Sequence, residues 1–157
     1  GNYTLGFQID GRFGGQFYSN TSANLDGVGV GARTLQYRES GVTLDGFNTA
    51  TNTDNTTSIT GQEYWGSTSS IAENYIYDQD NIRLRELSIG YQIPNTVDYG
   101  IQSASIQLIG RNLFFFSKEA PDVDPENMLG TAIGAQGFNS NNLPSLRSLG
   151  LNLTLNF

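Results

Sequence analysis

Hydrophobic and polar positions alternate without interruption over the last nine residues of the chain, 149–157. Leu149, Leu151, Leu153, Leu155 and Phe157 share one parity, and Gly, Asn and Thr occupy the positions between them. Because side chains alternate sides along a β-strand, this pattern predicts a strand with one apolar and one polar surface. It is typical of an outer-membrane β-barrel strand, with lipid on one side and a wet lumen on the other. The edge strand of a soluble sandwich shows the same alternation.

Three further segments predict strands, over residues 3–20, 81–94 and 101–118, and the last strand runs over 145–157. In the first, Gly14 and Gly15 permit a bulge or bend. In the second, the apolar parity changes near Arg85-Glu86, which indicates a one-residue bulge or a change of environment at the membrane boundary. The third has a less regular phase and ends in three consecutive Phe, 114–116, typical of an aromatic girdle at a membrane boundary. An ordinary core cluster is the alternative.

The connections between these strands alternate long, short, long. Residues 21–80 and 119–144 are polar, acidic stretches without sustained periodicity, whereas 94–100 is a short turn. Loops of such length count against a compact soluble domain but are common on the outer side of membrane barrels. We therefore predict an all-β chain, a transmembrane antiparallel β-barrel segment with two long extracellular loops. Four strands cannot close a barrel, because the smallest membrane barrels have about eight.

Composition excludes several kinds of chemistry. The 157 residues contain no Cys and no His, and the formal net charge is −7. Disulfides, thiolate metal sites and histidine general bases are therefore absent from this chain. The acidic balance argues against nucleic acid as a partner. We expect no enzyme activity and no cofactor.

Three local patterns offer chemistry that could form a site. The glycine-rich stretch 27–31 lacks the spacing, preceding strand and following helix of a nucleotide-binding loop. Asp122, Asp124 and Glu126 offer oxygen ligands for calcium, although a solvated acidic turn is the simpler interpretation. The loop aromatics are candidate contacts to a ligand or partner, with ordinary packing as the alternative. These residues are Tyr64, Trp65, Tyr75 and Tyr77.

Several motifs in order resemble a known family. The stretch 77–94, YDQDNIRLRELSIGYQIP, is followed by Gly110-Arg-Asn-Leu113 within 106–116, by Asp124-Pro-Glu126 and by the terminal strand 149–157. Together with Phe13-Gly-Gly15 and the stretch 41–46, these resemble the carboxy-terminal end of SusC/RagA-type TonB-dependent outer-membrane transporters of Bacteroidetes.

The resemblance implies a fold and a set of partners. The family barrel has about 22 strands around an amino-terminal plug, so residues 1–157 would supply about the last four strands, without the plug. It implies uptake of glycans or peptides in the outer membrane of a Gram-negative bacterium, with a SusD-like lipoprotein and with TonB, which contacts a segment outside this chain. The terminal strand would face lipid and be read by the barrel-assembly machinery. The alternatives are a structural or adhesive barrel and a secreted carbohydrate-binding β domain.

Overall fold

The computed structural model describes residues 1–94 and 100–157, which separate into two compact units. The first unit comprises Gly1–Gly15, Gln79–Glu119 and Pro144–Phe157, and the second comprises Gln16–Asp78 and Ala120–Leu143. The predicted short turn over 94–100 lies almost wholly outside the described residues. Each unit is described by itself below.

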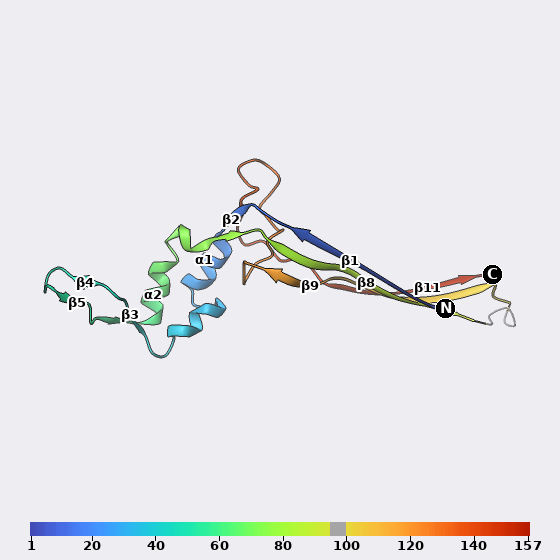
Figure 1. The fold of residues 1–157 in the computed structure, drawn as a ribbon, viewed down its shortest axis with the longest axis horizontal. Helices are drawn as coiled ribbons and strands as arrows, with labels where there is room; N and C mark the ends of the chain where they lie inside the picture. Colours follow the sequence, from blue (N-terminus) through green and yellow to red (C-terminus); the bar gives the residue numbers. More distant parts are fainter. Residues whose placement is uncertain (95–99) are drawn as a thin grey trace. The chain divides into compact units, whose positions relative to one another are not determined.

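The first unit is a four-stranded antiparallel sheet (Figure 1). Its strands are β1 (Tyr3–Arg12), β8 (Asn81–Ile93), β9 (Ser103–Lys118) and β11 (Ser148–Asn156), in the order β1-β8-β9-β11. The last two strands begin at Ser103 and Ser148, slightly later than the predicted segments 101–118 and 145–157. Long strands of this kind form because apolar and β-branched residues alternate with polar ones over eight or more positions.

The register aligns the apolar positions of all four strands in rows. Leu5 pairs with Ile89, Ile89 with Leu108, and Leu108 with Leu151. The next row contains Tyr3, Tyr91, Ile106 and Leu153. Since directly paired residues share a side of the sheet, one continuous face is apolar.

The opposite face is polar. The row next to Leu5 contains Thr4, Gly90, Gln107 and Asn152. Ion pairs between strands of this sheet include Arg85 Nε to Asp10 Oδ2 at 2.7 Å and Arg111 Nε to Glu86 Oε2 at 2.8 Å. The sheet therefore separates an apolar from a polar, partly charged surface.

The bulge predicted near Arg85 is confirmed. Gln8 pairs with Glu86 but Ile9 pairs with Leu84, so Arg85 is skipped, and the same skip occurs opposite β9. On β9 the irregularity falls at Asn112, whose φ of 52° is left-handed. Asn tolerates this conformation better than most residues. Asn112 and Leu113 are both skipped in the pairing, so Phe114 pairs with Leu84 on the side of Leu108, whereas Phe115 pairs with Arg83 on the other side.

The predicted single strand over 3–20 is wrong in its second half. β1 ends at Arg12, and Gly14 and Gly15 follow with φ of 84° and 89°. The left-handed region is open to glycine at no steric cost, so the pair turns the chain out of the sheet. A short strand, β2 (Gln16–Ser19), follows, and the Ser19 side chain then caps a helix by accepting a hydrogen bond from Ser22 N.

The second unit combines both predicted loops into one folded body. It contains helices α1 (Asn20–Gly27) and α2 (Gly61–Thr68) and the 3₁₀ helices η1 (Ala32–Tyr37) and η2 (Ala72–Tyr75). Its strands besides β2 are β3 (Val42–Thr43), β4 (Phe47–Asn48), β5 (Thr53–Asp54), β6 (Ser58–Ile59), β7 (Ile76–Asp78) and β10 (Phe138–Asn139). The predicted loop segments 21–80 and 119–144 therefore contain short helices and strands, while the described chain as a whole is mostly strand, as expected of an all-β chain. Helices of eight residues are too short to leave a visible period in the sequence.

The two loop segments join at β2, which pairs with β7 antiparallel and with β10 parallel. Phe17 packs with Ala120 and Val123 in a small apolar core, against which Tyr77 and Met128 also lie. Within the residues described, no helix is long and apolar enough to cross a membrane.

Candidate functional site

The apolar face of the sheet is exposed, and the terminal strand forms part of it. Leu149 and Phe157 are 77% and 80% exposed, and Leu151, Leu153 and Leu155 are also exposed. On the neighbouring strands, exposed apolar side chains include Tyr3, Leu5, Phe7, Ile89, Ile106 and Leu108. A soluble monomer rarely leaves a contiguous apolar surface of this extent in water.

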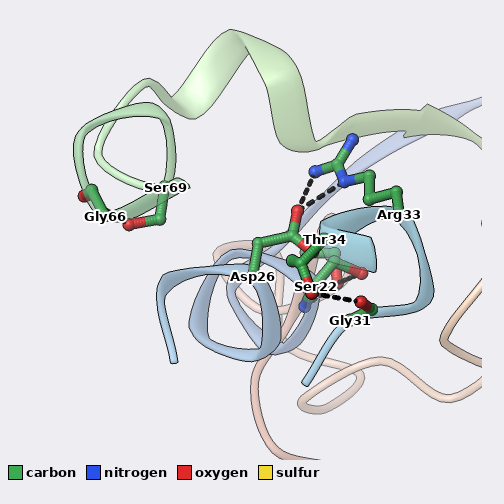
Figure 2. A network of polar contacts seen from close by, with 8 residues as sticks. Ser22, Asp26, Gly31, Arg33, Thr34, Gly66 and Ser69 are labelled. Carbon is green, nitrogen blue, oxygen red and sulfur yellow. Dashed lines mark hydrogen bonds and ion pairs between the residues drawn. The ribbon is translucent and has the colours of Figure 1, made fainter. Parts of the chain in front are cut away.

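In the second unit, an ion pair joins Arg33 of η1 to Asp26 at the end of α1 (Figure 2). Both Nε and Nη2 of Arg33 contact Asp26 Oδ2. The Asp26 side chain is fully buried, whereas that of Arg33 is one-third exposed. A buried carboxylate is tolerated only when it is paired, so Arg33 fixes the position of α1's last turn.

Two aromatic rings flank the Arg33 guanidinium. Its central carbon lies 5.4 Å from the Trp65 ring centroid and 4.7 Å from that of Tyr75. Cations bind such ring faces electrostatically. Four helical elements, α1, η1, α2 and η2, each contribute one residue to this group: Asp26, Arg33, Trp65 and Tyr75. Their contacts therefore hold the helical part of the second unit together, and we call the group the Arg33 clasp.

Burial and neighbouring charges shift the pKa values of side chains in and beside the clasp. Burial raises the pKa of Tyr75 to about 12, and the negative charge of Asp26 adds to the shift. Burial likewise raises the pKa of the neighbouring Tyr77, while the positive charge of Arg33 opposes this. Burial alone would lower the pKa of Arg33, but the hydrogen bond to Asp26 keeps it above its usual value. The phenols are therefore neutral and Arg33 charged at physiological pH.

A cleft of about 710 Å³ opens beside the clasp, within the second unit. Its walls come from the end of α1 and the following glycines, from η1, and from the amino-terminal turn of α2. Thr60 caps α2 in a reciprocal capping box with Glu63, which fixes that wall. The volume is in the range of small-molecule sites.

The comparisons with known proteins point to one family. No family model matches the chain. It is 30% identical, over 96% of its length, to the TonB-dependent receptor P3 of Formosa agariphila. The chain belongs to the TonB-dependent receptors. Its structure also resembles that of the RagAB peptide importer in an open-open state, with a TM-score of 0.56 and 17% identity over 99% of the chain. The chain spans 14% of the receptor's length and 16% of the importer chain. The names of both similar proteins describe a receptor or an importer, and neither describes an enzyme.

In this TonB-dependent receptor segment, the predicted aromatic contacts are largely internal. Tyr75 is fully buried and Trp65 is 7% exposed, so neither offers a ring face to a partner. Tyr64 packs edge-on against Trp65 at 5.0 Å between centroids, and Tyr77 lies 6.0 Å from Phe17. Trp65 and Tyr75 therefore pack around Arg33. Contact of the loop aromatics with a ligand or partner stays a prediction.

The receptor segment gives no support for the calcium alternative at Asp122, Asp124 and Glu126. Among the described residues, no group of three or more acidic side chains is arranged to hold a metal ion. Asp124 is buried, and its Oδ1 accepts a hydrogen bond from Glu126 N at 3.1 Å. The carboxylate therefore stabilises the turn that contains Pro125.

Neither the clasp nor the cleft was predicted from the sequence. The glycine-rich stretch 27–31, set aside as a nucleotide loop, supplies Val28 and Gly29 to the cleft wall. A methyl group at Gly31 would overlap Asp26 Oδ1. The glycine at position 31 is the one sequence feature that reflects the clasp. It could not be interpreted from the sequence, because the sequence does not show that Gly31 contacts Asp26.

Proposed function

We propose that this chain forms part of the barrel wall and two outer loops of a TonB-dependent outer-membrane importer that takes up glycans or peptides. The sheet supplies the wall, with its apolar face toward lipid and its polar face toward the lumen. The second unit lies outside the cell. A plug, further strands and the segment that contacts TonB belong to the rest of the receptor, and a SusD-like surface lipoprotein is the partner on the outside.

One observation carries the proposal, the alignment of apolar side chains in rows across the four strands β1, β8, β9 and β11. Burying such a face in lipid removes it from water, at about 25 cal/mol per Å² of apolar surface. The order β1-β8-β9-β11 leaves β1 and β11 at the edges of the described sheet. Unpaired edge groups cannot be left in hydrocarbon, which supports further strands on both sides.

The terminal strand has a second proposed role. Leu149, Leu151, Leu153, Leu155 and Phe157 present an exposed apolar stripe that ends on an aromatic residue. We propose that the barrel-assembly machinery recognises this stripe before the strand meets lipid.

Uptake by whole cells tests the proposed function. Cells that carry the full-length receptor are given fluorescently labelled neutral oligosaccharides and labelled oligopeptides, with a receptor deletion and a TonB deletion as controls. The proposal predicts uptake of at least one probe that both deletions abolish. Uptake that survives either deletion, or no receptor-dependent uptake of any probe, contradicts it.

A further inference from the structure

Three aspartates of this chain are each followed directly by a glycine, at Asp10-Gly11, Asp26-Gly27 and Asp45-Gly46. The backbone nitrogen of such a glycine can attack Cγ of the aspartate before it, because glycine has no Cβ to hinder the approach and its backbone turns freely. The attack closes a five-membered succinimide ring. It needs a local backbone rearrangement and a carboxyl group that can rotate, so the folded surroundings of each pair decide whether it reacts.

Two of the three pairs are held by the fold. Asp10 lies in β1, which pairs with β8 over its full length, and Arg85 Nε donates a hydrogen bond to Asp10 Oδ2 at 2.7 Å. Asp26 is fully buried in the last turn of α1, where its carboxylate is ion-paired with Arg33. Regular elements open at a higher free-energy cost than exposed connections do. Both carboxyl groups are therefore protected from attack while the chain is folded.

The third pair lies in an exposed connection. Asp45 and Gly46 are between β3 and β4 without belonging to a strand, and both residues are exposed. Within the part of the chain that the structure describes, the Asp45 carboxylate has no hydrogen-bond or ion-pair partner. Beyond its chain neighbours, a methyl group at Gly46 would have no atom within 4 Å. The Asp45 carboxyl group is therefore free to rotate, and the space around the attacking nitrogen is open.

We propose that Asp45 is a site of spontaneous conversion to isoaspartate. Gly46 N forms a bond to Asp45 Cγ, and one water leaves with an oxygen of the carboxyl group and the amide proton. Water then adds to the main-chain carbonyl carbon of Asp45 and breaks its bond to Gly46 N, which frees an α-carboxylate. The chain afterwards runs through Cβ and Cγ of residue 45. One water is released and one is consumed, so the conversion needs no oxidant, reductant or cofactor and leaves the mass unchanged.

The new linkage disturbs the ribbon that β4 and β5 form (Figure 1). Asn55 holds the chain on both sides of Asp45, because its Nδ2 donates to the Leu44 carbonyl and its backbone N donates to the Gly46 carbonyl, each at 2.8 Å. Isoaspartate adds one methylene carbon to the main chain between these two carbonyls. Since β4 and β5 are joined by two residue pairs, we expect the loss of one Asn55 hydrogen bond to increase opening of the ribbon.

Ageing of the purified full-length receptor in detergent tests the site. Folded receptor, and receptor unfolded in guanidinium chloride, are kept at neutral pH for several weeks and then digested. Mass spectrometry with electron-transfer fragmentation locates isoaspartate, because it distinguishes this isomer from aspartate of the same mass. Asp10 and Asp26 are internal controls. Asp45→Glu is the matched variant, because it keeps the exposed negative charge but would have to close a less favourable six-membered ring.

The proposal predicts that isoaspartate in the folded receptor accumulates at position 45 at least tenfold faster than at positions 10 and 26. After unfolding, the three rates should lie within threefold of one another, and Asp45→Glu should give no isomer at position 45. Amide hydrogen exchange over residues 47–54 should be faster in the aged wild type than in the aged variant.

Three results overturn the proposal: no isomer at position 45 of the folded receptor, equal accumulation at all three positions, or an excess at position 45 that is as large after unfolding as before. Equal hydrogen exchange in the aged wild type and the aged variant overturns the predicted opening of the ribbon.

Discussion

Arg33 and Asp26 form an ion pair in which the carboxylate is fully buried and both Nε and Nη2 of the guanidinium contact a single oxygen. Removing one partner leaves the other charge buried and uncompensated. We expect Arg33→Met to destabilise the second unit by about 3 kcal/mol, since breaking buried pairs costs about 3–5 kcal/mol and Arg33 is one-third exposed. Hydrogen exchange of amides in α1 and α2 of the full-length receptor measures the loss. The double variant with Asp26→Asn should recover part of it. A single variant that is as stable as wild type would show that the pair does not hold the clasp.

Gly31 is predicted to be irreplaceable for a purely steric reason. Its φ of −62° is open to any residue, but a methyl group there would overlap Asp26 Oδ1. Gly31→Ala should therefore displace the carboxylate from Arg33 and increase exchange in η1. Gly66→Ala is the matched control, because nothing lies within 4 Å of a methyl at that helical position, and alanine favours helix over glycine by about 1 kcal/mol. Similar behaviour of the two variants would mean that the contact at Gly31 is not restrictive.

Tyr75 should make the stability of the second unit decrease at alkaline pH. Its pKa is raised to about 12, whereas an unfolded tyrosine titrates near 10. The folded state thus retains a proton that the unfolded state loses, so the stabilisation is complete below pH 10 and declines as pH rises toward 12. Phenolate absorbance near 295 nm at pH 11 should be nearly the same for the folded wild-type receptor and the folded Tyr75→Phe variant, whereas after unfolding the wild type should show about one phenolate more than the variant. Ionisation of Tyr75 at about pH 10 in the folded receptor would contradict the assignment.

The sheet was more predictable than the second unit. Alternation over Leu149–Phe157 and over the stretch before Pro94 follows directly from strand geometry, and the parity change at Arg85 predicted a bulge that the register contains. The second unit depends on contacts between residues distant in sequence. Phe17 packs against Ala120 and Val123, more than one hundred positions away, and Arg33 meets Trp65 and Tyr75 across three short elements. Helices of eight residues, set by single caps such as Ser19 and Thr60, carry too few turns to be read from periodicity.

Substitutions on opposite faces of β11 should differ in cost. Leu151 pairs with Leu108 in the apolar row, whereas its neighbour Asn152 pairs with Gln107 in the polar row. If the apolar row lies near the middle of the membrane, Leu151→Arg should cost about 2–4 kcal/mol, and Asn152→Arg should cost much less. Equilibrium unfolding of the full-length receptor in lipid vesicles measures both. Equal costs would contradict the assignment of the two faces.

The central claim is that the apolar face of this sheet lies in lipid. It is tested most directly by measuring which side chains of the terminal strand face lipid and which face water. The chain contains no cysteine, so a single spin label can be introduced at each of positions 151 to 154 once any cysteines elsewhere in the receptor are replaced. In lipid vesicles, labels at 151 and 153 should be accessible to oxygen, which partitions into lipid, and labels at 152 and 154 should be accessible to a water-soluble nickel complex. This alternation is the result that a lipid-facing barrel wall predicts. Nickel accessibility at all four positions would show that the apolar face of this sheet does not lie in the membrane.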